Sequence, residues 1–221
     1  MTLAAHEAYE LWADTYPPVA HNPLMRLEQE VVEPVLAHIR ATRALDVGTG
    51  SGRYLPVLES TGAAVLGIDF SLAMLRRGST ALARVCADAR QLPFRRSSFD
   101  LINASLMVGD IPDLASWTRE MSRVLAGRGH LVYSDFHPSW AQQGWSRTFR
   151  SADGVMHDIS FTSHSIDAHL AALADAGLRV RTIREPRFGS SRTASEPALK
   201  EFRRRWGNPP VIVAFHAVKE P

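Results

Sequence analysis

Short, continuously apolar runs recur along the first two thirds of the chain, and segments with helical spacing of apolar residues lie between them. The runs predict strands. Since they do not alternate between apolar and polar residues, we expect both faces of the resulting sheet to be covered. The expected strands are residues 43–48, 63–70, 83–89, 99–105 and 129–136.

The helical segments between these strands predict βαβ units with right-handed crossovers on a parallel sheet. Residues 7–16 predict an earlier helix that Pro17 stops. A second helix begins at residue 23, and Pro34 is expected to kink it or restart it. Expected helix caps are Ser71, Asp113 and Ser165, and expected helix ends are Gly62, Gly127 and Gly177.

The pattern changes after residue 136. Residues 137–164 hold three histidines, two tryptophans and a predicted hairpin that turns at residues 152–154. A helix over 165–177, strands over 178–185 and 210–218, and a helix over 195–207 complete the chain. We expect a doubly wound α/β fold, with 137–164 inserted beside the carboxyl edge of the sheet, where such folds bind ligands.

Length and composition suit one globular domain, because the chain has 221 residues and 45% of them are hydrophobic. The net charge of +2 does not indicate a nucleic-acid binder. Cys86 is the only cysteine, which excludes an intramolecular disulfide; its small and apolar neighbours predict a buried strand position, and a reducing cytoplasm is the expected location. We expect no signal peptide and no membrane span.

One segment is locally basic. Residues 181–206 carry eight basic residues against three acids, and the run FRRRW interleaves aromatic residues with arginines. An RNA substrate is compatible with such a run, but a solvated helix face or recognition of an anionic small molecule explains it better. No HExxH, CxxC or paired-carboxylate motif occurs, so we expect no metal. Nothing in the sequence specifies an oligomeric state.

A glycine-rich turn, Gly-x-Gly-x-Gly at 48–52, follows the first expected strand. A phosphate-binding P-loop is excluded because no Lys-Ser or Lys-Thr pair follows the turn. A dinucleotide fingerprint needs its third glycine five residues after the first, where this chain has Arg53. Asp46, just before the turn, would oppose a pyrophosphate. The turn therefore indicates a ligand with a positively charged group and no required phosphate.

Two acidic residues farther along the chain indicate further parts of this ligand. Asp69 ends the next expected strand, about 20 residues past the turn, where a carboxylate can accept both hydroxyls of a ribose. Asp88, in the run ADARQLPF, can accept a hydrogen bond from an adenine amino group. Together these residues predict a ligand with an adenine, a ribose and a cationic, amino-acid-like end.

In this order and spacing, the motifs resemble those of the class I S-adenosylmethionine-dependent methyltransferases, and more narrowly the small-molecule group that includes the ubiquinone and menaquinone C-methyltransferases. The resemblance covers roughly residues 40–136. The matching stretches are LDVGTGSG (45–52), VLGIDFSLAML (65–75), CADARQLPF (86–94), FDLINASLMVGDIPD (99–113) and RGHLVYSDF (128–136).

The resemblance implies S-adenosylmethionine as cofactor and a seven-stranded, mostly parallel sheet whose last strand is antiparallel. Where the family often has a His or Gln three or four residues past Ser105, this chain has Val108 and Gly109. The implied cofactor residues are Asp46, Gly48 and Gly50 at the methionine part, Asp69 at the ribose, Phe70, Asp88 and Ala89 at the adenine, and Asn103 and Ser105 on the floor near the sulfonium.

Further candidates lie outside these motifs. Tyr16 is the residue expected to close the cofactor site from the N-terminal helices, as a tyrosine often does in the family. His137 and His164 are the candidate general bases, since histidine titrates near working pH, although His137 is equally compatible with a loop-capping role. Residues expected to form an apolar wall around the acceptor are Trp140, Trp145, Phe149 and Phe161.

The sequence thus predicts a single domain that transfers a methyl group from S-adenosylmethionine to an oxygen, nitrogen or carbon nucleophile of a small-molecule acceptor, with an aromatic or enol-like metabolite favoured. An RNA methyltransferase, or a protein that binds S-adenosylmethionine without transferring its methyl group, is the alternative. The expected parts are an N-terminal helical lid (1–40), a cofactor-binding half (41–136), a substrate-cap insertion (137–164) and the C-terminal half of the sheet (165–221).

Overall fold

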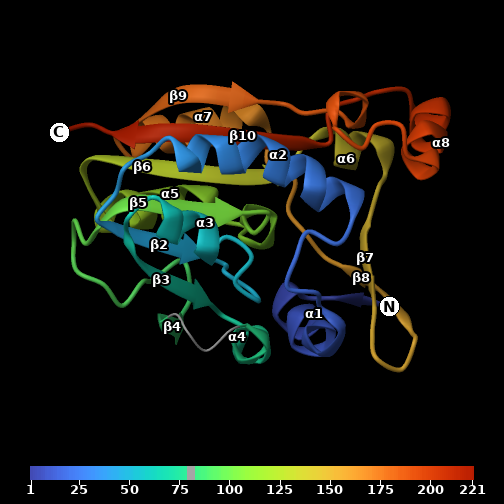
Figure 1. Ribbon diagram of the computed structural model, residues 1–221, viewed down its shortest axis with the longest axis horizontal. Coiled ribbons are helices and arrows are strands. Elements are labelled where there is room, and N and C mark those ends of the chain that lie inside the picture. Colours follow the sequence, from blue (N-terminus) through green and yellow to red (C-terminus); the bar gives the residue numbers. More distant parts are fainter. Residues whose placement is uncertain (79–82) are drawn as a thin grey trace.

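A twisted seven-stranded sheet forms the centre of the protein (Figure 1), of which the computed structural model describes residues 1–78 and 83–221. The last strand in chain order, β10, runs antiparallel to both of its neighbours, and the other pairings are parallel. The predicted fold class is therefore confirmed. In their order across the sheet the strands are β4 (Ala83–Cys86), β3 (Ala64–Asp69), β2 (Arg43–Val47), β5 (Phe99–Ser105), β6 (Leu125–Phe136), β10 (Ile212–Lys219) and β9 (Leu178–Arg184).

Helices cover both faces of this sheet (Figure 1): α2 (Pro23–Ala37) and α3 (Leu55–Ser60) lie on one face, α5 (Leu114–Val124) and α7 (Ile166–Asp175) on the other. Adjacent strand residues point to opposite faces. Leu101 packs with the α2 and α3 side chains, and its neighbour Ile102 packs with the α5 and α7 side chains. This explains why the strands are continuously apolar in sequence.

The helix boundaries agree with the expected caps more closely than with the expected ends. Asp113 caps α5 by accepting from the Ser116 amide, and Ser165 caps α7 by accepting from the Ala168 amide. The expected end of α5 at Gly127 is wrong, because β6 already begins at Leu125 and pairs with β5 there. The expected restart at Pro34 does not occur, since α2 runs through it.

A second, three-stranded sheet lies beyond the carboxyl ends of the central strands (Figure 1). Its order is β1 (Thr2–Leu3), β8 (Met156–Ile159) and β7 (Arg147–Arg150), so the N-terminus pairs with the 137–164 insertion. The expected hairpin turn at 152–154 is confirmed, because β7 and β8 pair antiparallel on either side of it. Helix α1 (Ala5–Trp12) packs on this sheet through Ala8.

Shorter elements complete the chain: η1 (Ala13–Thr15), α4 (Leu72–Arg77), η2 (Val108–Asp110), α6 (Ser139–Gln143), η3 (Phe188–Ser190) and α8 (Pro197–Trp206). The helix expected after Ser71 is α4, and Ser79, the last residue expected in it, lies outside the described residues. The predicted burial of Cys86 is wrong. This residue is exposed, because it ends β4, an edge strand with a single neighbour in the sheet.

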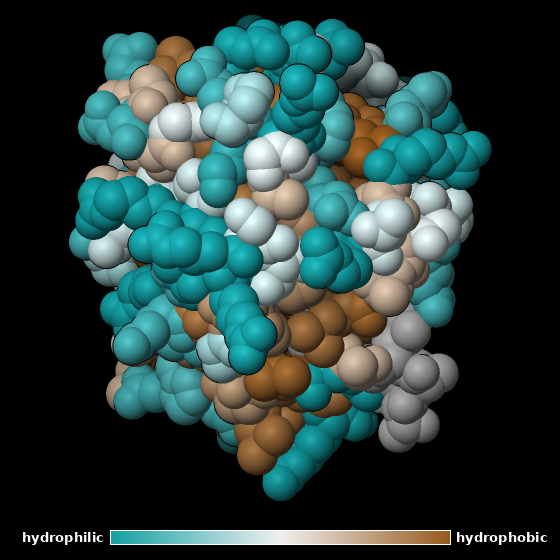
Figure 2. All heavy atoms as spheres, turned by 90° about the vertical axis from the view of Figure 1, so that its left-hand side faces the viewer, coloured by the Kyte–Doolittle hydropathy of each residue, from teal (hydrophilic) through white to brown (hydrophobic). Residues whose placement is uncertain are grey.

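The opposite end of the molecule is the amino edge of the parallel strands, which Figure 2 shows face on. Hydrophilic residues cover most of its upper part, where β9 and β10 lie, and hydrophobic residues gather in its lower half. No helix in the described part of the chain has the length and apolar character needed to cross a membrane.

Candidate functional site

A cavity of about 890 Å³ opens at the carboxyl edge of the central sheet, and residues of α1 and of the β7–β8 hairpin form part of its lining. It lies where the strand order reverses between β2 and β5, the position at which open α/β folds bind ligands. Of the residues predicted to hold a ligand, the cavity lining includes Tyr16, Gly48, Gly50, Asp69, Phe70, Asp88, Ala89 and Ser105. The fold thus brings together eight residues spread over 90 positions of the sequence.

The glycine turn forms one wall of this cavity. Gly48 and Gly50 have φ angles of +67° and +55°, a backbone conformation that side chains disfavour. A Cβ added at Gly48 would lie 2.8 Å from the Met107 side chain. The turn therefore needs glycine both for its conformation and to leave room for the loop that follows β5.

Asp46 and Asn103, two further predicted cofactor residues, lie beneath the turn and are not among the residues that line the cavity. The Asp46 carboxylate accepts from the Thr49 hydroxyl and from the Asn103 amide, each at 2.7 Å. Burial raises the pKa of Asp46 to about 6, against these two hydrogen bonds, which lower it. In this structure both side chains support the glycine turn from below.

Asp69 stands at the end of β3 and faces the cavity. Its two carboxylate oxygens accept from the amides of Gly50 (2.8 Å) and Ser71 (2.9 Å), which fixes the side chain at the turn. Burial raises the pKa of Asp69 to about 6. No cation lies within ion-pair distance of it in the described chain, so its remaining hydrogen-bonding capacity is directed at the cavity.

The residues expected at an adenine lie side by side on the more open part of the lining. Phe70 is 37% exposed, and the His6 ring meets it edge to face at 5.2 Å. The Asp88 carboxylate is exposed and pairs with Arg90 at 2.7 Å, and these hydrogen bonds lower the pKa of Asp88. Asp88 can therefore accept hydrogen bonds as an anion at neutral pH.

Neither predicted general base reaches the cavity. The His137 ring lies between the Glu185 carboxylate (3.0 Å) and the Ser139 amide (3.1 Å), so both its nitrogens are engaged at the start of α6. His164 is buried against the Ile111 carbonyl oxygen, 2.9 Å from its Nε2. The geometry supports the loop-capping role for His137, since its Nδ1 accepts from the Ser139 amide and the residue is not part of the cavity lining.

Sequence reasoning missed a buried cluster on the cavity wall. Arg147 of β7 donates to the Asp110 carboxylate at 2.5 Å and to the Tyr9 hydroxyl at 2.6 Å, and its guanidinium lies over the Phe136 ring at 4.7 Å. Arg147 and Asp110 are each only 7% exposed in their side chains. Because these residues lie far apart in sequence, the only local signal was the alternating burial expected along a hairpin strand.

The end of the cavity that α6 and α8 line is aromatic. Trp145 is the central residue of this group, with ring centroids 5.1 Å from Phe202 and 5.5 Å from both Trp140 and Trp206. We call this group the aromatic end; its cavity-lining members are Phe136, Trp140, Trp145, Phe188, Phe202 and Trp206. Trp140 and Trp145 were predicted to line the acceptor site, and both line the cavity.

The other two predicted wall residues lie elsewhere. Phe149 is buried between the second sheet and α1, where it stacks on Trp12 at 5.1 Å, and Phe161 is not among the lining residues. Sequence reasoning did not select Phe202 or Trp206, because α8 looked like a charged surface helix, nor Phe188, which lies in the short helix η3 before it. The apolar face of α8 was the available signal.

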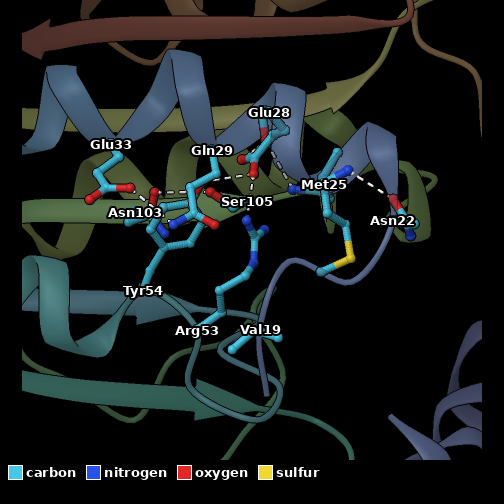
Figure 3. Close-up of polar contacts among 12 residues, drawn as sticks. Val19, Asn22, Met25, Glu28, Gln29, Glu33, Arg53, Tyr54, Asn103 and Ser105 are labelled. Carbon is cyan, nitrogen blue, oxygen red and sulfur yellow. Dashed lines mark hydrogen bonds and ion pairs between the residues drawn. The ribbon is translucent and has the colours of Figure 1, made fainter. Parts of the chain in front are cut away.

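Behind the glycine turn, a buried carboxylate joins α2 to the sheet (Figure 3). Glu28 is fully buried and accepts from Arg53 (2.8 Å), the Tyr54 hydroxyl (2.7 Å) and the Ser134 hydroxyl (2.7 Å). Arg53 itself lines the cavity beside Gly50. In the described part of the chain, no three His, Cys, Asp or Glu side chains gather as a metal site would require.

Comparisons with known proteins agree with this architecture. A family model described as a methyltransferase domain matches residues 45–133. The chain is 35% identical over 173 residues to a malonyl-[acyl-carrier protein] O-methyltransferase of Halorhodospira halophila, covering 71% of this chain and 56% of that protein. It is 36% identical over 95 residues to a demethylmenaquinone methyltransferase of Corynebacterium urealyticum, covering 42% and 41% respectively.

The chain thus spans about half the length of these two curated relatives. Among solved structures, an S-adenosylmethionine-dependent methyltransferase from Mesorhizobium loti matches with a TM-score of 0.69 at 22% identity, covering 87% of this chain and 98% of that one. At that identity the likeness concerns the fold. The family match contains the glycine turn and Asp69 but stops before the aromatic end of the cavity.

Proposed function

Residues 45–133 place this chain among the class I S-adenosylmethionine-dependent methyltransferases, and on that premise we propose that it transfers a methyl group from S-adenosylmethionine to an aromatic or enol-like small molecule. The observation that carries the proposal is the single cavity that joins the glycine turn and Asp69 to the aromatic end. The methyl donor and an apolar methyl acceptor can both occupy this cavity.

The residues at the polar end fit S-adenosylmethionine. Asp69 offers a carboxylate without a cationic partner, suited to ribose hydroxyls, and Asp88 is an anionic acceptor beside Ala89, suited to an adenine edge. Gly48 and Gly50 line the same cavity, and Met107 and Met74 pack where a side chain at these two positions would lie. We propose that these residues hold the cofactor, and that Phe70 and Tyr16 cover it.

The cofactor supplies a methyl group already activated by a sulfonium, so the protein's part is alignment and exclusion of water. We propose that Tyr9, Trp12 and Tyr16 close the site from the N-terminal segment, with Arg147 holding Tyr9 in place through its hydroxyl. His137 and His164 lie outside the cavity. We therefore propose that the acceptor enters in a form that can take the methyl group without losing a proton to either histidine.

The aromatic end favours an apolar acceptor. Six aromatic side chains line it, which suits a flat or bulky apolar molecule. One relative is named for demethylmenaquinone and the other for malonyl-[acyl-carrier protein]. A carboxylate acceptor would need a free cation at this end, and Arg147 is already paired with Asp110. We therefore propose an acceptor of the apolar, aromatic kind.

The basic residues of segment 181–206 do not support the RNA alternative. Arg181 lies in a cleft at the amino edge of the sheet, whereas Arg203, Arg204 and Arg205 lie on α8 at the other end of the molecule (Figure 1). Arg204 also pairs with Glu201. RNA binding would need a continuous basic surface. We also propose a cytoplasmic location, in keeping with the single free cysteine.

The test has two stages. Calorimetry first measures binding of S-adenosylmethionine, and then a panel of phenols, quinols, enols and amines is incubated with it while S-adenosylhomocysteine is quantified. Formation of S-adenosylhomocysteine with apolar aromatic acceptors supports the proposal. Tight binding with no turnover on any acceptor would instead favour a protein that binds the cofactor without transferring its methyl group.

A further inference from the structure

A second concave feature lies at the amino edge of the central sheet, at the opposite end of the strands from the proposed methyl-transfer cavity. It is a cleft of about 390 Å³ between the first residues of β6, the first residues of β9 and the end of β10. Figure 2 looks onto this edge, and hydrophilic residues cover the part of it where β9 and β10 lie. The lining includes four cationic side chains, Arg128, Arg179, Arg181 and Lys219, and one acidic side chain, Glu220.

Three of these four cations have no carboxylate partner. Arg128, Arg179 and Arg181 are exposed, and none of them forms an ion pair with another described residue. Lys219 differs, because its ammonium donates to two backbone carbonyl oxygens at the end of α5. The cleft therefore carries a net positive charge on three guanidinium groups, each of which has N–H donors to offer a ligand.

Two of these arginines stand at irregular points of the backbone. Arg181 is an extra residue in β9, because the residues on either side of it pair with consecutive residues of β10, His216 and Ala217. A bulge of this kind changes the direction of a side chain relative to regular alternation. Arg128 has a φ angle of +65°, which residues other than glycine rarely adopt. Both irregularities occur at arginines of the same cleft, which favours a binding role over a solvated surface.

A pair of histidines lies beside Arg181. Nδ1 of His130 is 2.8 Å from Nε2 of His216, so the two nitrogens share one proton. Burial and the nearby Arg181 lower the pKa of His130, while burial, His130 and Arg181 lower the pKa of His216 to about 4. Both rings are therefore neutral at neutral pH, and the arginines supply the charge of the cleft. An anion held by Arg181 would favour protonation of this pair.

We propose that this cleft binds a small, phosphate-bearing anion from solution. Guanidinium groups match phosphate oxygens through paired N–H donors, and three such groups line the cleft from β6 and β9. The volume suits a small molecule, whereas RNA would need a basic surface that continues beyond the cleft. Because this site and the methyl-transfer cavity lie at opposite edges of the sheet, the inference does not depend on the proposed function.

The first test is calorimetry at constant ionic strength, with inorganic pyrophosphate as the probe and the wild type, Arg181→Gln and Arg184→Gln as the proteins. Arg184 is the matched control, because it is an exposed arginine of the same strand that is not part of the cleft lining. We expect Arg181→Gln to weaken binding by about 10- to 100-fold, the range for a hydrogen bond to a charged group, and Arg184→Gln to change it by less than about 2-fold. Circular dichroism verifies that each variant is folded.

The second test localises the anion by nuclear magnetic resonance of the histidine rings. Sulfate is the probe here, because its charge stays constant while the pH is varied. The ring signals of His130 and His216 are followed against pH with and without saturating sulfate. We expect sulfate to raise the pKa of the pair in the wild type, since an anion beside Arg181 stabilises an imidazolium. The effect in Arg181→Gln should be smaller.

Each outcome has a distinct meaning. If pyrophosphate does not bind, or if Arg181→Gln and Arg184→Gln weaken it equally, the cleft is not a site and the inference is overturned. Binding of pyrophosphate without a response of the two histidines to sulfate would place the anion elsewhere and would also overturn it. Loss of affinity in Arg181→Gln alone, together with the raised histidine pKa, supports the inference. Binding of S-adenosylmethionine is measured separately, and its failure would overturn the proposed function only.

Discussion

Arg147 and Asp110 form a buried ion pair across the cavity wall, with 2.5 Å between Nη1 and Oδ1. Arg147 belongs to the hairpin of the insertion, and Asp110 follows the central strand β5. The same guanidinium holds the Tyr9 hydroxyl of α1. One side chain thus joins the N-terminal segment, the insertion and the central sheet around the proposed acceptor.

The first prediction concerns this pair. Arg147→Ala leaves the Asp110 carboxylate buried without a cation, which typically costs about 3–5 kcal/mol of unfolding free energy. Urea unfolding followed by circular dichroism measures the loss. The double variant Arg147→Met/Asp110→Asn removes both charges and should recover most of the stability. Equal losses in the single and double variants would contradict a role for the ion pair itself.

Much of the fold was predictable from the sequence because its determinants are local. Continuous apolar runs gave the five strands up to residue 136, and the caps Asp113 and Ser165 lie where their hydrogen-bonding side chains put them. The wrong end at Gly127 and the wrong burial of Cys86 have a common physical reason. Both depend on which strand lies next to which in the sheet, and local pattern carries no information about that.

The residues of the candidate site likewise fall into those that local sequence predicts and those that it does not. Asp69, Gly48 and Gly50 were predictable because the turn and the strand end that position them are close in sequence. The cluster of Tyr9, Asp110 and Arg147, by contrast, exists only after the N-terminus has paired with the hairpin. His137 lies outside the cavity lining, and its ring is held by the Ser139 amide and by Glu185, a residue 48 positions farther along that local sequence could not indicate.

The second prediction follows from the raised pKa of Asp69. Its pKa is about 6 in the folded protein and 3.8 as a free side chain. Between these values the folded state holds a proton that the unfolded chain has lost, so the free energy of unfolding falls as pH rises from 4 to 6. Asp69→Asn removes this pH-dependent contribution to the free energy of unfolding. Its stability relative to the wild type should therefore improve by about 3 kcal/mol between pH 4 and pH 7.

Cofactor affinity should show the opposite trend in the wild type. As Asp69 ionises between pH 5 and pH 7 it becomes a better acceptor for ribose hydroxyls, so S-adenosylmethionine should bind more tightly as pH rises. Calorimetry across this pH range, on the wild type and on Asp69→Asn, separates the effect of Asp69 ionisation on affinity from that of other ionisable groups. A pH profile in the variant with the wild-type slope would show that Asp69 is not the titrating group.

The third prediction concerns the two histidines. Since His137 contacts Glu185 and Ser139, and His164 contacts the Ile111 carbonyl, neither is placed to take a proton from an acceptor. We expect His137→Ala and His164→Ala to keep turnover within about 3-fold and to lose stability instead, because each leaves a polar partner unpaired. If a folded variant loses more than about 100-fold in kcat, the replaced histidine does act as a general base and this prediction is wrong.

The last prediction concerns the aromatic end of the cavity. Trp206 and Phe202 lie on one face of α8 and line the cavity around Trp145. Replacing either with alanine removes apolar contact surface from the acceptor alone, and a buried aromatic side chain contributes about 1.5–3 kcal/mol. The KM for a bulky apolar acceptor should therefore rise by about 10- to 100-fold, while the dissociation constant of S-adenosylmethionine stays as in the wild type. Arg204→Ala, on the exposed side of the same helix, is the matched control and should change neither quantity. If Trp206→Ala weakens a small polar acceptor as much as a bulky apolar one, the aromatic end supports the fold rather than the choice of acceptor.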